Sequence, residues 1–396
     1  MTGDRVAAIV VSGHTMALAV VRSLGEAGIP VSVLHYDPRD MAQASKYAVT
    51  DVRIPHPLHD ETGFVDAIIE QARRSGRSIL MPASDESLVG ISRNSDVLAR
   101  YTTVACPEWA VTQRFIDKTQ TYALAEAHGV PAPRTLVPRS PEELESFAGT
   151  MTFPMLLKPA ESHRFAERFK TKMIRVESMA ELRHWYDAAS GTGLATMLQE
   201  VIPGPDSSVV NYNAYFWDGV PVAEFTARQL RKAPPRFGSP RVVVSARIPE
   251  VIEPGRRILA AMGFNGFACT EFKQDQRDGI YKLMEVNGRH NLSGLLAVRC
   301  GVNFPLIEYR HLVEGVLPEN TRYRSGIYWT DFLRDAGYSL AFLRSDPHSP
   351  ADYVAPYARR GCDAIFDRHD MGPFAVRVRY LMNTAVRTAQ QARGRT

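Results

Sequence analysis

Two different patterns of hydrophobic and polar positions divide the chain. In its first part, short continuous apolar runs typical of buried strands alternate with amphipathic stretches typical of helices. The predicted elements are a strand at residues 6–11, a helix at 16–27, a strand at 31–34, a helix near 64–72 and a strand at 79–81. This alternation predicts a parallel, doubly wound α/β sheet that extends to about Pro107.

Helix caps and hairpin turns mark the rest of the chain. Asp117, Ser140 and Ser178 are each placed to cap a helix. Asp-Gly pairs predict hairpins, because these residues adopt the tight turns that join antiparallel strands. The predicted strands are at residues 155–158, near 173–176, and in two hairpins that join 209–217 to 220–225 and 267–273 to 280–287. We therefore expect an α+β arrangement with antiparallel strands in this part.

Composition adds only broad limits. The chain has 396 residues, 45% of them hydrophobic, and a formal net charge of +4, which excludes disorder and predicts two or three packed units. So small an excess of basic residues does not indicate a nucleic-acid-binding protein, and it fits an anionic small ligand equally well. No apolar run reaches membrane-spanning length, so no membrane span is expected. The assembly state stays open, a homodimer included.

Cysteine spacing and the N-terminus bear on location. The four cysteines, at positions 106, 269, 300 and 362, are too far apart for a zinc knuckle or a CxxC motif. Few cysteines in a chain of this size suggest a reducing compartment. The N-terminus lacks the long apolar region of a signal peptide. The expected location is the cytoplasm.

The turn after the first predicted strand lies where α/β proteins can bind a dinucleotide. Residues 12–17 contain Gly13 alone, whereas a dinucleotide-binding turn needs three glycines for a tight turn and close phosphate approach. We therefore expect no NAD site, and Gly13 is interpreted as a residue that lets the chain turn into a helix. A small substrate near Gly13 and His14 remains open, because open α/β sheets bind ligands at such strand ends.

The second predicted hairpin carries the most informative acids. If its turn centres on Asp278, Glu271 lies opposite Glu285, and Asn287 shares the face of Glu285. Two facing carboxylates destabilise a hairpin unless a cation lies between them. Oxygen ligands of this kind suit magnesium, which is usually shared with substrate phosphates. The alternative is a solvated polar face, but the polar loop that follows, with Arg289 beside the acids, favours a metal–phosphate centre.

Four motifs in this order resemble the ATP-grasp superfamily. They are Asp117-Lys118 before a helix that ends at residues 129–133, the strand Leu156-Leu157-Lys158-Pro159, the segment at residues 199–206, and Glu271 with Glu285-Val286-Asn287-Gly288-Arg289. They match the start of the family's lid, its phosphate-binding lysine strand, its adenine-binding hinge and its metal-binding signature. The nearest resemblance is to predicted carboligases, and D-aspartate ligase and D-alanine–D-alanine ligase are more distant.

The resemblance implies a domain plan and a set of roles. The expected plan is an N-terminal α/β domain at residues 1–112, a lid and hinge at 113–205, a core with the magnesium hairpin at 206–320, and a C-terminal helical extension at 321–396. The expected ATP-binding residues are Lys118, Lys158, Glu200, Ile202, Asp206 and Lys172. The metal ligands would be Glu271, Glu285 and Asn287, holding Mg²⁺, for which Mn²⁺ can substitute. Arg289 matches the arginine near the transferring phosphoryl group.

Two segments depart from the family pattern or carry little signal. Residues 161–172 stand where many members have a glycine-rich loop over the phosphates, but they contain no glycine. Candidates for the acceptor pocket are Arg228, Arg231, His290, Asn291 and Ser293. Residues 374–388 mix aromatic and basic side chains, which fits a membrane-surface or partner helix, although a packed helix with a solvated basic face is preferred.

The reaction implied by the resemblance is ATP-dependent ligation of two small molecules. A carboxylate would become an acyl phosphate, and an amine would then displace phosphate to give an amide. Charge stabilisation and positioning carry such phosphoryl transfer, so no protein nucleophile is needed. The alternatives are an ATP-grasp enzyme with a non-amine acceptor and a nucleotide-binding regulatory protein whose catalysis has lapsed.

Overall fold

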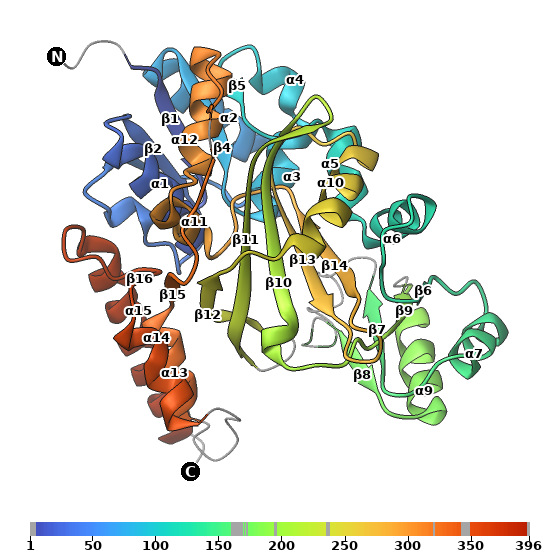
Figure 1. The fold of residues 1–396 in the computed structure, drawn as a ribbon. Coiled ribbons are helices and arrows are strands. Elements are labelled where there is room, and N and C mark those ends of the chain that lie inside the picture. The colour runs from blue at the N-terminus through green and yellow to red at the C-terminus, as the bar shows by residue number, and fades with distance from the viewer. Residues whose placement is uncertain are drawn as a thin grey trace.

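The computed structural model describes residues 5–159, 169, 171, 173–193, 196–234, 238–319, 321–341 and 349–393. Within these ranges the chain forms three sheets (Figure 1). The first belongs to the N-terminal domain, the second to a small lid, and the third and largest lies between them in Figure 1.

The N-terminal sheet is parallel and has the strand order β3-β2-β1-β4-β5. Its strands are β1 (Ala7–Val11), β2 (Val31–His35), β3 (Ala48–Arg53), β4 (Ser78–Pro82) and β5 (Thr103–Val104). Alternate residues of β1 face opposite layers: Ala8 and Val10 pack with α1 (Thr15–Glu26), and Ile9 packs with α2 (Glu61–Ser75). The expected doubly wound α/β sheet is therefore confirmed.

Further helices lie before and after β5, and the last two lead from this sheet to the lid. They are α3 (Asp85–Arg93), α4 (Ser95–Leu98), α5 (Trp109–Ile116) and α6 (Lys118–Ala127), with the short turn η1 (Ala42–Ala44) after β2. As expected, Asp117 caps α6, because its side chain accepts a hydrogen bond from the backbone N–H of Thr119.

The lid has its own sheet and its own small core. The strand order is β6-β9-β7-β8, and the elements are β6 (Thr135–Leu136), α7 (Pro141–Gly149), β7 (Met155–Pro159), β8 (Ile174–Val176), α9 (Met179–Ser190) and β9 (Thr196–Glu200). The predicted serine caps are present, since Ser140 and Ser178 accept hydrogen bonds from the N–H groups of Glu143 and Glu181. Leu157, Leu182 and Leu198 lie in one apolar cluster.

The central sheet has the order β14-β13-β10-β11-β12-β15-β16. Its elements are η2 (Asp206–Ser208), β10 (Val209–Trp217), β11 (Val220–Ala233), β12 (Ser239–Ser245), η3 (Pro249–Val251), α10 (Ile252–Ala261), β13 (Gly266–Gln274), β14 (Tyr281–Asn287), α11 (Gly294–Cys300), α12 (Phe304–Tyr309) and η4 (Arg310–Glu314). Both expected hairpins, β10–β11 and β13–β14, are confirmed.

The segment after residue 320 contains more than helices. It comprises β15 (Tyr328–Thr330), α13 (Phe332–Ala341), α14 (Pro350–Ala358), β16 (Gly361–Asp363) and α15 (Gly372–Arg393). β15 pairs with β12, and β16 pairs with β15, so this segment extends the central sheet. A buried ion pair of 2.9 Å between Arg22 and Asp370 fastens it to the N-terminal domain. In the described ranges no helix combines the length and apolar character that a membrane crossing needs.

Candidate active site

Two glutamates face each other on the β13–β14 hairpin, as the sequence predicted. Glu271 is the direct partner of Glu285, and Asn287 lies opposite Cys269 two positions further along the hairpin. The register shifts just after Glu271, so that Phe272 pairs with Leu283. Carboxylate oxygens and an amide oxygen therefore line one face of the hairpin.

Cations and an amide surround the two carboxylates. The Lys118 ammonium lies 3.4 Å from Glu285, and the Lys232 ammonium lies 3.6 Å from Glu271. The Gln229 amide donates to the other oxygen of Glu271 at 2.7 Å. These groups offset the repulsion between like charges that lie directly opposite.

The donor set fits a hard divalent cation that shares its ligands with phosphate. Glu271, Glu285 and Asn287 supply oxygens only, which suits magnesium. Within the described residues, no three His, Cys, Asp or Glu side chains form a metal-binding group by themselves. Further ligands would therefore have to come from a substrate such as a nucleotide, as is usual for magnesium.

Lys158 approaches this site from the lid. Its ammonium is buried on β7 and donates to the Gln199 side chain at 2.6 Å. Burial, and then the nearby Lys118 charge, lower the pKa of Lys158 to about 8. The hydrogen-bond partner of this buried ammonium is thus a neutral amide, and an anion would stabilise its charged form.

The hinge after β9 is connected to the hairpin by lysines and an arginine. Lys273 donates to the backbone carbonyl of Ile202 at 2.7 Å, and the Glu200 carboxylate lies 2.9 Å from Arg277 and 3.4 Å from Lys282. Asp206 is buried, and its carboxylate accepts the backbone N–H of Lys232 at 2.9 Å. The Lys232 ammonium in turn lies near Glu271, so Lys232 connects the hinge to the metal-site hairpin. Lys172 lies outside the described residues, as does most of the segment 161–172.

Arg289 is held in a fixed direction beside the hairpin. Its guanidinium makes two hydrogen bonds to the Asp85 carboxylate, at 2.9 and 3.0 Å, and a third of 3.2 Å to the Asn287 side-chain oxygen. Asp85 is the first residue of α3, so the N-terminal domain orients this arginine. A paired, planar guanidinium is well suited to direct its other donors at phosphoryl oxygens.

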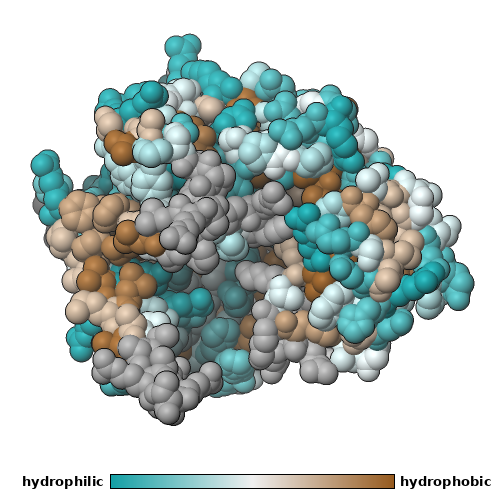
Figure 2. All heavy atoms as spheres, turned by 90° about the horizontal axis from the view of Figure 1, so that it is seen from below, coloured by the Kyte–Doolittle hydropathy of each residue, from teal (hydrophilic) through white to brown (hydrophobic). Residues whose placement is uncertain are grey.

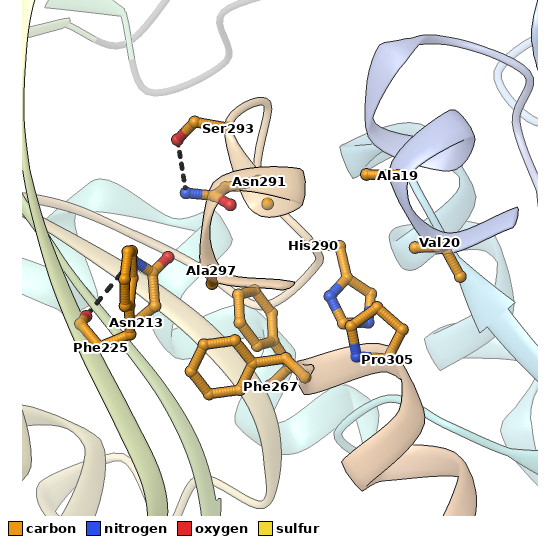
Figure 3. Close-up of a pocket in the computed structure, with 12 residues that line it drawn as sticks. Ala19, Val20, Asn213, Phe225, Phe267, His290, Asn291, Ser293, Ala297 and Pro305 are labelled. Carbon is orange, nitrogen blue, oxygen red and sulfur yellow. Dashed lines mark hydrogen bonds between the residues drawn. The ribbon is translucent and has the colours of Figure 1, made fainter. Parts of the chain in front are cut away.

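Three acceptor-pocket candidates lie around a small cavity between α1, α11 and α12 (Figure 3). His290 is buried, stacks on Phe267 and lies 3.1 Å from Glu308. Asn291 donates a 3.4 Å hydrogen bond to Ser293, and both side chains line the cavity. The structure therefore brings these three residues together next to Arg289, while their role in substrate binding stays a prediction.

The two arginine candidates lie elsewhere. Arg228 donates to the Ser207 carbonyl at 2.7 Å and to the Tyr281 hydroxyl at 3.2 Å. Arg231 is buried and forms a 2.6 Å ion pair with Asp335 of α13, away from the acids of the hairpin. The expectation that Arg231 lines the acceptor pocket is thus at odds with its place in the fold, because its charge is used to join the sheet to the C-terminal segment.

This buried pair should contribute strongly to stability. Asp335 also lies 3.1 Å from the buried Arg241, so Asp335→Ala would leave two buried guanidinium groups without their carboxylate. We expect a loss of about 3–5 kcal/mol in the free energy of unfolding. Urea unfolding would measure it, with the exposed Asp187→Ala as the matched control. A loss below about 1 kcal/mol would contradict this role of Asp335.

Sequence reasoning missed several residues at the site. Gln229, Lys232 and Asp85 all contact the predicted ligands or Arg289. The alternation of side chains along β11 could have indicated which of its residues face the site. Register shifts after Gln229 and after Arg231 interrupt this alternation. The contact of Asp85 joins residues 204 positions apart, and no local pattern predicts it.

Known proteins with similar sequences are ligases. No family model matches the chain. It is 23% identical over 287 residues to D-aspartate ligase from Enterococcus faecium, a match that covers 67% of each chain. It is 27% identical over 215 residues to D-alanine–D-alanine ligase from Methylococcus capsulatus, covering 50% of this chain and 65% of the ligase. The chain thus spans about two thirds of the length of these relatives.

Solved structures decide the fold. L-amino acid ligase from Bacillus licheniformis has a TM-score of 0.60 at 15% identity, over 78% of this chain and 74% of that one. Biotin carboxylase from Campylobacter jejuni, in a β,γ-ATP complex, has a TM-score of 0.63 at 16% identity, over 82% and 74% of the two chains. The chain has an ATP-grasp fold. Its distant homology to D-aspartate and D-alanine–D-alanine ligases agrees with the resemblance seen in the sequence.

Within this ATP-grasp fold, the site lies where its parts converge. β7 of the lid supplies Lys158, the β13–β14 hairpin supplies the two glutamates, and α3 of the N-terminal domain fixes Arg289 through Asp85. The face seen in Figure 2 is hollowed near its centre, and hydrophilic residues are visible inside the hollow.

Proposed function

We propose that this chain is an ATP-dependent ligase that activates a carboxylate as an acyl phosphate and couples it to an amine. The observation that carries the proposal is the pairing of Glu271 with Glu285 beside Lys118 and the fixed Arg289. Two carboxylates kept together by cations form a centre for a metal-bound polyphosphate. The distant homology to D-aspartate and D-alanine–D-alanine ligases supports a reaction that joins two small molecules.

In the proposed first step, a substrate carboxylate oxygen attacks the γ-phosphorus of ATP, and ADP leaves. Lys118 and Lys158 would attract the phosphates, and Arg289 would stabilise the charge on the transferring group. Magnesium, held by Glu271, Glu285 and Asn287, would neutralise phosphate charge when it is bound. These residues position and stabilise the reactants, and none needs to act as a nucleophile.

In the proposed second step, the amine attacks the acyl carbon and phosphate leaves as its bond to that carbon breaks. The amine loses a proton, and the products are an amide, ADP and phosphate. His290, Asn291 and Ser293 would contact the acceptor from the cavity next to Arg289.

The proposal is tested first by an ADP-release screen of carboxylates against amines. With ¹⁸O in the carboxylate of the substrate that is found, one labelled oxygen should appear in the released phosphate. Unlabelled phosphate, or AMP with pyrophosphate in place of ADP, would contradict an acyl-phosphate intermediate. A non-amine acceptor is the second candidate, because the fold alone does not fix the acceptor. Identification of the coupled product separates the two.

ATP binding should depend on the charge of Lys158. With a pKa of about 8, this lysine is charged at pH 7 and mostly neutral at pH 9. The dissociation constant of ATP–Mg should therefore rise about tenfold between these pH values, because the uncharged amine no longer attracts phosphate. Lys158→Ala should bind ATP–Mg more weakly at pH 7 and should flatten the pH dependence. Thermal stabilisation by ATP–Mg measures both effects, and equal stabilisation of the variant and the parent would exclude contact with phosphate.

A further inference from the structure

One cation of the C-terminal segment has no hydrogen-bonded carboxylate partner among the described residues. Arg377 lies on α15 and is half-buried, and its Nε and Nη1 atoms are buried without a hydrogen-bond partner. It lies over the ring of Tyr380, whose centre is 5.6 Å from the guanidinium, and it interacts electrostatically with the Asp331 carboxylate. Buried donors are normally satisfied, so an arginine in this state is suited to receive an anionic ligand.

The helix that carries Arg377 begins beside the carboxyl end of the parallel sheet. The start of α15 packs on η1 so closely that a Cβ on Gly372 would lie 1.9 Å from the Ala44 carbonyl oxygen. η1 in turn is bonded to the turn after β1, where the Gly13 carbonyl accepts the N–H groups of Met41 and Ala42. Open α/β sheets bind ligands at this end of their strands. The C-terminal segment thus covers the kind of edge at which a substrate is expected.

Several positive groups surround the same turn. Burial, and then Arg39 and Arg377, lower the pKa of His14 to about 4, and Arg334 of α13 acts in the same direction. The neighbouring acids are largely engaged. Asp37 holds Arg39 at 2.6 Å, and Asp331 accepts the backbone N–H of Arg334. One oxygen of Asp40 accepts two backbone N–H groups, and its other oxygen has no hydrogen-bond partner. No side chain caps the start of α1, and its first turn has no acid. An anion would therefore meet a neutral imidazole, a guanidinium with unsatisfied donors and an uncapped helix start.

This turn is the direct neighbour of the element that holds Arg289. β1 and β4 are adjacent, with Val11 opposite Pro82, and Asp85 follows shortly after β4. The loops after both strands lie at one edge of the sheet, because the two strands are parallel. A ligand at Arg377 could therefore extend along this edge toward Arg289.

We propose that Arg377, with His14, binds an anionic group of one of the two substrates, a carboxylate or a phosphate that is not itself transferred. That the ligand is a substrate follows from the proposed ligase function, on which this part of the assignment rests. It gives the C-terminal segment a role in substrate recognition, whereas Asp335 of the same segment, paired with Arg231 of β11, serves stability. The substrate class is then a molecule with a second anionic group besides the reacting one.

Small anions test the site without knowledge of the substrate. Malonate and inorganic phosphate, each titrated without nucleotide, should raise the melting temperature of the parent protein, and the more effective of the two indicates which anion the site prefers. Arg377→Ala should weaken this binding at least tenfold, and Arg377→Lys should restore part of it. Arg379→Ala, which removes an exposed arginine two residues away on α15, should bind like the parent. Absence of stabilisation in the parent, or equal binding by Arg377→Ala, would overturn the assignment.

The same variants separate this site from the nucleotide site. Stabilisation by ATP–Mg should be equal in the parent, Arg377→Ala and Arg379→Ala, because Arg377 is not placed at the phosphates. Once the screen has identified the substrates, Arg377→Ala should raise the KM of one of them at least tenfold and leave the KM of ATP unchanged. If both substrate KM values are unaltered while Glu285→Gln abolishes turnover, the Arg377 assignment is wrong and the ligase proposal stands. If no pair is turned over, the anion titration still decides on Arg377.

Discussion

Glu285→Gln is expected to lower turnover at least ~100-fold while the protein stays folded, because the change removes one charge from the proposed magnesium ligands. Glutamine keeps the shape of the side chain and an oxygen that Lys118 can approach. The variant should also lose most of its thermal stabilisation by ATP–Mg, since stabilisation by a ligand follows affinity. Steady-state ADP release and melting curves measure the two effects.

Without ligands, the same variant should be at least as stable as the parent protein. Glu285 lies directly opposite Glu271, and removal of one of two facing charges relieves their repulsion. A matched control is Glu253→Gln, because Glu253 is an exposed carboxylate with its own cation, Arg257, at 3.2 Å. The control should keep normal turnover. Near-normal turnover in a folded Glu285→Gln variant would remove the hairpin from the mechanism.

The elements that could be predicted were those encoded locally. The Asp-Gly turn at residues 278–279 predicts the β13–β14 hairpin, and the register shift just after Glu271 brings this residue opposite Glu285. Asp117, Ser140 and Ser178 cap helices through bonds to residues two or three positions further on. Such short-range geometry follows directly from sequence spacing.

Contacts between distant segments could not be predicted in the same way. β15 and β16 have three residues each, too few for a period of two to show, so the C-terminal segment was expected to be helical. The direction of Arg231 depends on the register shifts in β11, which turn it toward Asp335. The surroundings of Arg377 could not be predicted either, because they bring together segments from the two ends of the chain.

Arg289 should affect the chemical step more than any other cation of the site. Its guanidinium is held by Asp85 and Asn287 before any substrate binds, so it does not need to reorganise during phosphoryl transfer. Arg289→Ala should lower kcat about 10²–10³-fold, the usual effect of losing one fixed donor to a developing charge. The affinity for ATP–Mg should change little, because contacts made mainly in the transition state contribute little to ground-state binding.

The pairing with Asp85 allows a sharper test of this role. Asp85→Asn leaves Arg289 in place but removes the charge that orients it, so kcat should fall by less than in Arg289→Ala, with ATP affinity unchanged. Arg299→Ala is the matched control, because Arg299 makes a similar two-bond contact with Glu26 of α1, outside the proposed site. Single-turnover transfer of ¹⁸O from the labelled carboxylate to phosphate should be slowest in Arg289→Ala and less slow in Asp85→Asn. In the control, Arg299→Ala, it should be the fastest of the three. If Asp85→Asn and Arg289→Ala instead weaken ATP binding as strongly as they slow transfer, Arg289 acts in nucleotide binding and its assignment to the transferring phosphoryl group fails.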